Sequence, residues 1–331
     1  MSVWLIDADT LASGRFVLSP LAETLGCLRD LETEQADHPG RRAWMDAVLP
    51  AYRAHMSENP VARRIVREGL IALKTNWNAD FLTPAPMGAF EPSFEDEVAV
   101  IRATPPAKAR ADLEVSVGGP LPEILRRDDL PRIAADAITE VWRYAVEPFW
   151  PRRRRVLEAD IIARTRQLSR DGWAAALEGL RPGIRWLGDG RLQINAAEYP
   201  PRDVSGAELF LVPITSPHGW VSWADGVRYA KFYPCAGELA APDPAAVPRA
   251  LARLLGEGRA AVLTLLDDPK STTQLVALTG LPLGSVGRHL KILLEARLAD
   301  RRRSGRSVLY YRTRAGDTLI HAQTATPTVT P

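Results

Sequence analysis

Apolar side chains recur every three or four positions through most of the first 180 residues, which is the spacing of one face of an α-helix. The clearest case begins at Ser19, which can cap a helix that has Pro20 in its first position, and continues through Leu21, Leu25 and Leu28. Prolines in residues 83–92 and the glycines before Pro120 interrupt the pattern. The predicted helices cover residues 20–32, 41–55, 60–73, 94–101, 108–117, 130–145 and 152–180.

The pattern changes after Pro182, where short segments rich in β-branched and aromatic residues predict strands. Gly188-Asp189-Gly190 separates the first two segments and is typical of a β-hairpin turn. Residues 1–235 are therefore predicted to form one module, helical to about residue 180 and β-rich over 183–235. Its predicted strands cover residues 184–187, 192–195, 208–213, 220–223 and 227–233.

A smaller module follows a break in the chain. Residues 236–248 contain three prolines and are predicted to be a linker, whereas the polar, Thr- and Pro-rich tail 322–331 is predicted to be disordered. Between them, residues 249–321 are predicted to form an independent domain. Its predicted elements are helices over 249–255, 258–266, 272–279 and 282–296, then strands over 298–303 and 307–312.

The order of these elements indicates a winged helix-turn-helix. Ser271 and Gln274 have the spacing of a capping box at the start of one helix, and Gly280 supplies the sharp turn into the next. The hairpin after the second helix corresponds to the wing. The predicted fold class is α+β and mainly helical: a helical domain with a small β-sheet, followed by this C-terminal winged helix-turn-helix.

The charge divides unevenly between the two modules. Residues 249–331 carry a formal charge of +7 and residues 1–248 a charge of −5, although the whole chain of 331 residues carries only +2. A small basic domain after a larger acidic one predicts an anionic partner at the C-terminal end, and double-stranded DNA fits a winged helix.

The second helix of the motif and the wing supply the candidate DNA contacts. Arg288 and Lys291 are three positions apart and share a helix face, while strand alternation directs Arg301 and Arg303 to one side. The free N–H groups at the start of the capped helix can hold a phosphate. The predicted DNA-binding residues are Ser271, Thr272, Ser285, Arg288, His289, Lys291, Arg301, Arg302, Arg303 and Arg306. For His289 the alternative is packing between the recognition helix and the wing.

Three stretches of this domain are distinctive: Val286-Gly-Arg-His-Leu-Lys-Ile-Leu, then Glu295-Ala-Arg-Leu, then Arg303-Ser-Gly-Arg-Ser-Val-Leu-Tyr-Tyr-Arg. They resemble the winged-helix domain of the ArsR/SmtB family of bacterial transcriptional repressors. The resemblance covers about 70 of the 331 residues and implies DNA binding. A long module ahead of this domain resembles a less characterised actinobacterial branch of the family.

The chain departs from that family in two places. Members that sense metals carry thiols and a carboxylate in the helix before the recognition helix, where this chain has Ser271, Thr273 and Gln274, which are poor ligands for thiophilic metals. We therefore expect no metal and no cofactor. The start of the recognition helix has Pro282, Leu283, Gly284 and Gly287 where relatives tend to have polar residues, which leaves fewer side chains for reading bases.

Several features of the first module have two interpretations. Its tryptophans (Trp44, Trp77, Trp142, Trp150, Trp173, Trp186, Trp220 and Trp223) could line an effector pocket or belong to the core. The β-rich stretch 208–234 could instead form a subunit interface. The basic run 152–155 is predicted to be a solvated first helical turn, with a supplementary DNA contact as the alternative. Cys27 and Cys235 are predicted to be ordinary packed thiols.

These observations favour a sequence-specific transcriptional regulator: a homodimeric repressor that a small-molecule effector releases from an inverted-repeat operator. A constitutive DNA-binding or interaction scaffold, and an enzyme with an appended winged helix, stay open as alternatives. Because no nucleotide-binding, metalloprotease or nucleophile motif occurs, we expect no enzymatic activity. The N-terminus has no basic segment typical of a signal peptide, and no apolar stretch is long enough to span a membrane, so we expect a cytoplasmic protein.

Overall fold

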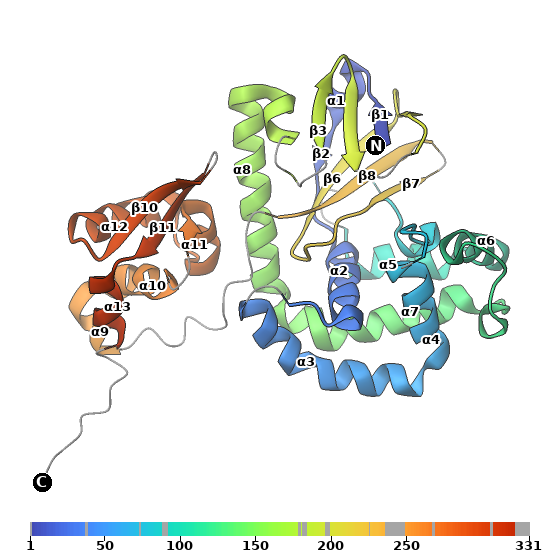
Figure 1. The fold of residues 1–331 in the computed structure, drawn as a ribbon, viewed down its shortest axis with the longest axis horizontal. Coiled ribbons are helices and arrows are strands. Elements are labelled where there is room, and N and C mark those ends of the chain that lie inside the picture. Colours follow the sequence, from blue (N-terminus) through green and yellow to red (C-terminus); the bar gives the residue numbers. More distant parts are fainter. Residues whose placement is uncertain are drawn as a thin grey trace, which may run out of the picture. The chain divides into compact units, whose positions relative to one another are not determined.

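The computed structural model (Figure 1) describes residues 2–36, 39–72, 74–87, 92–177, 180, 184–195, 199–224, 226–235, 249–266, 269–304 and 307–321. The chain divides into two compact units: Met1–Asp37 with Arg42–Ala236, and Gly237–Pro331 with the short stretch His38–Arg41. The predicted class, mainly helical α+β with a C-terminal helix-turn-helix, is confirmed. The predicted linker and tail, 236–248 and 322–331, lie outside the described residues, so the domain boundaries stay predictions.

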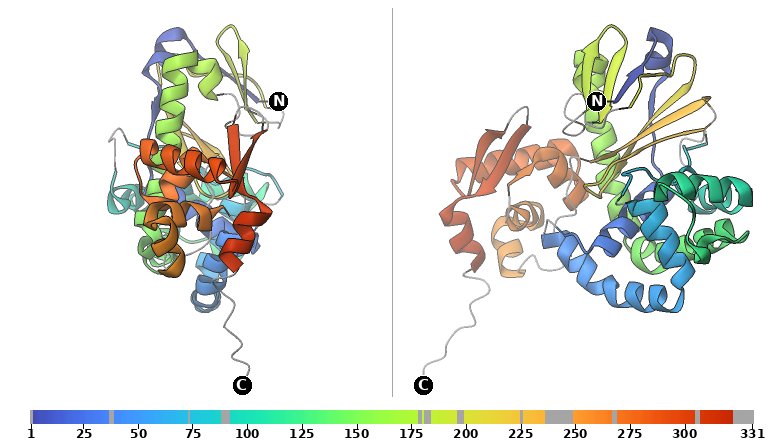
Figure 2. Two further views of the ribbon diagram at one scale, coloured as in Figure 1. Left: turned by 90° about the vertical axis from the view of Figure 1, so that its left-hand side faces the viewer. Right: turned by 45° about the vertical axis from the view of Figure 1, so that its right-hand side comes forward.

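The helices and the strands occupy separate parts of the first unit (Figure 1 and Figure 2). The helix α2 begins at the predicted cap: the Ser19 hydroxyl accepts a hydrogen bond from the Ala22 N–H at 2.9 Å, and Pro20 follows it. The helices are α2 (Pro20–Thr33), α3 (Pro39–Glu58), α4 (Pro60–Ile65) with a π-helical continuation (Val66–Ile71), α5 (Phe94–Arg102), α6 (Pro106–Val117) and α7 (Leu130–Val141) with a π-helical continuation (Trp142–Val146). Short 3₁₀ helices occupy Asp80–Leu82, Glu123–Leu125 and Glu147–Phe149.

The strands of the first unit form two four-stranded sheets, ordered β3-β4-β1-β5 and β2-β6-β8-β7. In the second sheet β6 and β8 pair in parallel along their full length, from Glu208 opposite Arg228 to Ile214 opposite Pro234. The predicted hairpin joins β3 to β4, with positive φ at Asp189 (49°) and Gly190 (69°), as a tight two-residue turn requires. The strands are β1 (Ser2–Leu5), β2 (Arg15–Phe16), β3 (Arg185–Gly188), β4 (Arg191–Asn195), β5 (Arg202–Asp203), β6 (Glu208–Ile214), β7 (Val221–Ala224) and β8 (Arg228–Pro234).

The start of the chain differs from the prediction of a helical stretch up to about residue 180. Residues Ser2–Leu5 form β1, which pairs with β4 nearly 190 positions later, and Arg15–Phe16 form β2 beside β6. Between them lies the short helix α1 (Ala8–Ser13), whose N–H of Thr10 donates to the capping Asp7 carboxylate at 2.7 Å. These strands are too short to show a period, and only their distant partners fix them as strands.

The long helix α8 (Trp150–Leu177) connects the helical part of the unit to its strands (Figure 1). It was predicted as one helix over 152–180, but Gly172 interrupts it with φ 77° and ψ 177°. Glycine takes this backbone conformation without a steric penalty. Beyond the break, Leu177 is buried among the strands, and the ring of Trp173 stacks on Phe16 with centroids 6.1 Å apart.

A buried ion pair fixes α8 to α2. Arg153 Nη1 lies 2.5 Å from Glu23 Oε1, and both side chains are at most 2% exposed. The second carboxylate oxygen of Glu23 accepts a hydrogen bond from the Thr215 N–H at 2.8 Å, just after β6. The Arg153 guanidinium also lies over the Trp44 ring, 4.6 Å from its centroid. The prediction of a solvated basic run over 152–155 is thus wrong for Arg153, because burial of a partner carboxylate on α2 draws this guanidinium inward.

A second buried carboxylate, on α5, contacts the start of α2. This is Glu97, which accepts hydrogen bonds from the Ser19 hydroxyl at 2.6 Å and from the Leu21 N–H at 2.9 Å. Burial raises the pKa of Glu97 to about 7, although both hydrogen bonds oppose this shift. This carboxyl therefore titrates near neutral pH in the folded protein.

The second unit is a compact helical domain with a three-stranded sheet ordered β10-β11-β9. Its predicted helices and hairpin are present, with two additional elements: the short strand β9, which pairs with β11, and the final helix α13. The elements are α9 (Arg249–Leu255), α10 (Glu257–Leu265), β9 (Lys270–Ser271), α11 (Thr272–Thr279), α12 (Leu283–Glu295), β10 (Ala299–Ser304), β11 (Ser307–Arg312) and α13 (Arg314–His321).

We expect Arg153→Met to lower the free energy of unfolding of the first unit by about 3–5 kcal/mol, because it leaves the Glu23 carboxylate buried without its counter-charge. The double variant Glu23→Gln/Arg153→Met should recover much of this loss, since no charge then remains buried. Guanidinium-induced unfolding followed by circular dichroism measures both. Arg143→Met, which removes an exposed ion pair with Glu140, is the control and should cost no more than about 1 kcal/mol. A double variant as unstable as the single one would contradict the interpretation.

Glu97 should make stability depend on pH. Its folded-state pKa of about 7 lies above the ordinary pKa of a glutamate, 4.5, so its contribution to stability is complete at acid pH and is lost as pH rises through 7. Between pH 6 and pH 8 we expect Glu97 to reduce the unfolding free energy by about 1 kcal/mol. Denaturation curves at the two pH values should show this difference in the parent chain and a smaller one in Glu97→Gln. An equal pH effect in both proteins would assign the titration to another group.

Candidate nucleic-acid interface

The helix α11 is held by the predicted capping box. The Ser271 hydroxyl accepts a hydrogen bond from the Gln274 N–H at 3.2 Å, and the Gln274 side chain accepts one from the Ser271 N–H at 2.6 Å. At the other end Gly280 adopts φ 68°, a left-handed conformation that ends α11 and turns the chain toward α12. Local signals in the sequence therefore set both ends of the first helix of the motif.

The orientation of α12 follows from its apolar positions. Val286, Leu290 and Leu293 are buried against Leu263 of α10 and Leu275 of α11, in the core of this domain. Because the three residues are spaced by three or four positions, they occupy one side of the helix. The opposite side of α12 is consequently exposed.

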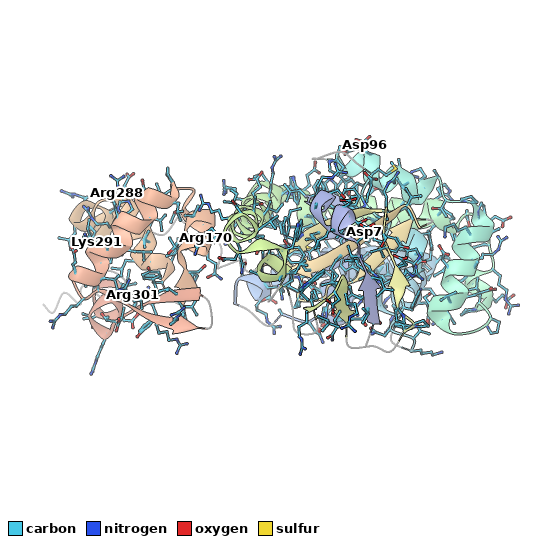
Figure 3. The ribbon with its side chains drawn as sticks, turned by 90° about the horizontal axis from the view of Figure 1, so that it is seen from above. Asp7, Asp96, Arg170, Arg288, Lys291 and Arg301 are labelled. Carbon is cyan, nitrogen blue, oxygen red and sulfur yellow. The ribbon has the colours of Figure 1, made fainter. Side chains whose placement is uncertain are left out.

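The exposed side of α12 carries the predicted base and phosphate contacts. Arg288 is exposed, and its Nη2 donates to the Ser285 hydroxyl at 3.3 Å, so the structure brings these two predicted residues together. The Lys291 side chain is 78% exposed, and its Nζ lies 3.9 Å from the Glu295 carboxylate. Figure 3 shows Arg288 and Lys291 on α12 and Arg301 on the strand β10. Exposed cations on a helix are well placed for the phosphates and base edges of a major groove.

The wing presents further exposed cations. In the ladder between β10 and β11, Arg301 is opposite Tyr310, Arg302 opposite Leu309 and Arg303 opposite Val308. All three arginines are exposed, and strand alternation separates Arg301 and Arg303 from Arg302. Arg306, also predicted to contact DNA, lies outside the described residues.

His289 lies against the helix α10. A Cβ added at Gly258 of that helix would lie 2.5 Å from the Nε2 atom of His289, so this glycine makes room for the ring. The pKa of His289 is lowered, first by burial and then by the charges of Arg259 and Arg288. His289 thus packs against α10, whereas the alternative prediction had it packing between the recognition helix and the wing. A neutral, half-buried imidazole is a weaker phosphate ligand than an exposed cation.

Ser271 and Thr272 are placed at the N-terminus of α11, as predicted. The Ser271 hydroxyl is engaged in the capping box, and its backbone pairs with Leu309 of the wing. Thr272 is half-buried. Any contact of these two residues with a phosphate would therefore use backbone N–H groups at the start of the helix.

Some of the basic residues of this domain stabilise its fold and are not exposed for DNA binding. The Arg312 guanidinium forms an ion pair with Asp317 of α13 at 2.8 Å and donates to the Thr264 carbonyl at 3.3 Å. Lys270 on β9 is only 4% exposed. The count of basic residues, from which the sequence predicted an anionic partner, thus includes residues that stabilise the fold.

Residues 257–301 match the family model described as bacterial regulatory protein, arsR family. This segment begins at α10, contains α11 and α12, and ends within β10. It is an ArsR-family helix-turn-helix. The predicted resemblance is therefore confirmed for the C-terminal region, and it indicates a DNA-binding transcriptional regulator. No curated protein and no solved structure matches the chain.

The ArsR-family helix-turn-helix has no thiols at its candidate contacts. In the part of the chain that the structure describes, no group of three His, Cys, Asp or Glu side chains could hold a metal ion. Cys27 is buried, with its Sγ 3.8 Å from the Glu23 carboxylate, and Cys235 is half-buried. Among the same residues, no helix combines the length and the hydropathy needed to cross a membrane.

The exposed side of α12 also contains two glycines, which sequence reasoning treated only as missing side chains. Gly284 and Gly287 are exposed, and a Cβ added at either position would meet no atom within 4 Å. Glycine inside a helix is destabilising because it loses more backbone freedom than other residues. The recognition helix is therefore less stable than its length suggests, and its outer surface is flat between Ser285 and Arg288.

We expect Gly287→Ala to stabilise the ArsR-family helix-turn-helix by about 0.5–1 kcal/mol, because the added methyl enters open space in a helix interior. Gly258→Ala is the matched control in α10 and should destabilise the same domain, since its Cβ would collide with His289. Hydrogen exchange of α10 and α12 peptides in the full chain reports the stability of this unit. Faster hydrogen exchange than in the parent chain in both variants would contradict the interpretation that Gly287 destabilises α12.

Proposed function

We propose that the protein is a homodimeric transcriptional repressor without enzymatic activity of its own. In this proposal two copies bind the half-sites of an inverted repeat through their α12 helices, about one helical turn of DNA apart. A small molecule bound by the first unit favours a conformation with lower affinity for the operator, and DNA is released by this population shift.

The observation that carries the proposal is the set of exposed cations on the ArsR-family helix-turn-helix. Arg288 and Lys291 lie on the side of α12 opposite the core, and Arg301, Arg302 and Arg303 extend from the wing. A helix can enter the major groove while the wing contacts the flanking phosphates or minor groove. The flat surface at Gly284 and Gly287 leaves Ser285 and Arg288 as the main side chains for base contacts.

A sensing role for the first unit is supported by a cavity of about 770 Å³ within it. This volume lies in the range of small-molecule sites, roughly 300–1,000 Å³. Three of the tryptophans considered above line it: Trp77, Trp220 and Trp223. The other five pack in or against the two cores of the unit (Trp44, Trp142, Trp150, Trp173 and Trp186).

The test is fluorescence anisotropy of the full chain with the DNA upstream of its own gene and with a scrambled duplex, at two salt concentrations. We expect sequence-preferring binding that weakens steeply with salt. Arg288→Ala should cost about 1–3 kcal/mol on the preferred DNA, as the loss of a base contact does. Arg301→Ala/Arg303→Ala should lower the salt slope by about two units, one for each phosphate contact.

Arg314→Ala is the control, because Arg314 is exposed on the same domain but lies outside α12 and the wing. Its affinity and salt slope should stay close to those of the parent chain. An unchanged salt slope in the double arginine variant would refute the wing contacts. Equal affinity for both duplexes would refute sequence-specific regulation at this operator.

A further inference from the structure

The cavity of the first unit lies where both sheets meet the helical part. Its walls come from β1, the end of β4, the segment 199–203 that contains β5, and β7 with β8. Residues 76–80 and Arg29 of α2 complete the lining from the helical side. All of these segments belong to the same compact unit.

Aromatic rings form a continuous part of the wall. The ring of Trp77 makes edge contacts with Tyr199 and with Trp223, at centroid distances of 5.2 Å and 5.3 Å. These three residues come from distant parts of the sequence and all line the cavity. Tyr199 is 39% exposed, so its ring is open to a ligand. Rings presented in this way favour a flat, apolar ligand.

Both cations and carboxylates line the cavity. Among the described residues of the lining, the cations are Arg29, Arg202 and Lys231, and the acids are Asp80 and Asp203. The Arg202 guanidinium lies 4.0 Å from the centre of the Trp223 ring, so one cation is placed directly on the aromatic wall. Lys231 lines the cavity from the middle of β8 and is only 4% exposed.

The acid next to the aromatic wall is only weakly acidic. Burial, with the charge of Asp112 second, raises the pKa of Asp80 to about 6, while Lys108 and Arg202 oppose this shift. A negatively charged ligand would raise this pKa further. In its protonated form Asp80 would not repel an anion.

Two donors of the lining have no acceptor in the described part of the chain. The Nδ2 atom of Asn78 and the Nε1 atom of Trp220 are both buried and make no hydrogen bond to any described residue. Trp220 is only 8% exposed, and its indole N–H can act only as a donor. Buried donors without acceptors are uncommon, and a ligand oxygen would satisfy them.

We propose that this cavity binds a planar aromatic anion, with its rings against Trp77, Tyr199 and Trp223 and its acidic group beside Arg202 and Lys231. The binding itself does not depend on the DNA-binding role. The further step, that such an anion is the effector, rests on the proposed function and is measured separately.

The test compares two dyes that differ by one charged group. The anionic dye 1-anilinonaphthalene-8-sulfonate and its neutral analogue N-phenyl-1-naphthylamine are titrated into the full chain, with dye fluorescence as the readout. We expect one saturable site for the anion and an affinity at least ten-fold higher than for the neutral dye. Equal affinities, or no saturable binding of the anion, would overturn the proposal.

Two variants locate the site. Arg202→Gln should weaken the anion at least five-fold and the neutral dye much less, whereas Trp77→Leu should weaken both. Arg185→Gln and Trp186→Leu change the same residue types on β3, outside the cavity lining, and should leave both affinities unchanged. If Trp77→Leu fails to fold, as circular dichroism would show, Arg202→Gln still decides. Unchanged anion binding in Arg202→Gln would overturn the assignment.

Operator binding is then measured with and without a saturating concentration of the anionic dye. Sequence-specific DNA binding without dye binding would reject the cavity proposal and retain the regulator. Dye binding at the cavity with no effect on operator affinity would retain the binding site and reject this class of anion as the effector. The two failures are therefore distinguishable.

Discussion

The buried ion pair between Glu23 and Arg153 holds the first unit together where its helices meet its strands. One carboxylate oxygen of Glu23 accepts from the α8 guanidinium, and the other accepts from the backbone of Thr215 after β6. The Ser216 hydroxyl donates to the carboxylate of Asp30, about two turns further along α2, at 2.8 Å. A buried carboxylate is costly without such partners, so these bonds act together to set the position of α2 against the sheet.

The cavity depends on this arrangement. Arg29 of α2 and residues 218–220, which follow the Thr215 contact, form neighbouring parts of its wall. Gly26 of α2 has no room for a side chain, because a Cβ there would lie 2.9 Å from the Cβ of Ser216. The close approach of α2 to this loop brings Arg29 to the wall of the cavity. One residue of the cavity wall and the carboxylate that holds the fold thus lie on the same helix.

The ArsR-family helix-turn-helix has a different physical basis. Its core is small and apolar, and its charges lie outside, on α12 and the wing. With Gly284 and Gly287 on the outer side of α12, few side chains can read bases directly. Affinity for DNA would then come mainly from phosphate contacts, and a larger share of specificity from DNA shape at the wing. In the proposed homodimer such an interface would be sensitive to small changes in the spacing of the two α12 helices, as the proposed release by a ligand requires.

Most elements of the C-terminal domain follow from local sequence signals, although β9 and α13 do not. The capping box at Ser271, the left-handed Gly280 and the spacing of Val286, Leu290 and Leu293 are local signals, and each acts within one or two helical turns. The hairpin at Asp189 was predictable for the same reason. Local preference and tertiary packing agree at these positions, so pattern reasoning succeeds there.

Other features follow from contacts between distant parts of the chain. The strands β1 and β2 exist because β4 and β6 pair with them from more than 170 positions away, and no periodicity in two to four residues could reveal this. The basic run at Arg153 is typical of a solvated helical turn, and only the buried partner on α2 shows that this side chain points inward. The contact of His289 with Gly258 of α10 is equally absent from the local sequence. The cavity, likewise, is assembled from segments that are distant in sequence, and non-local contacts of this kind leave no local trace in the chain.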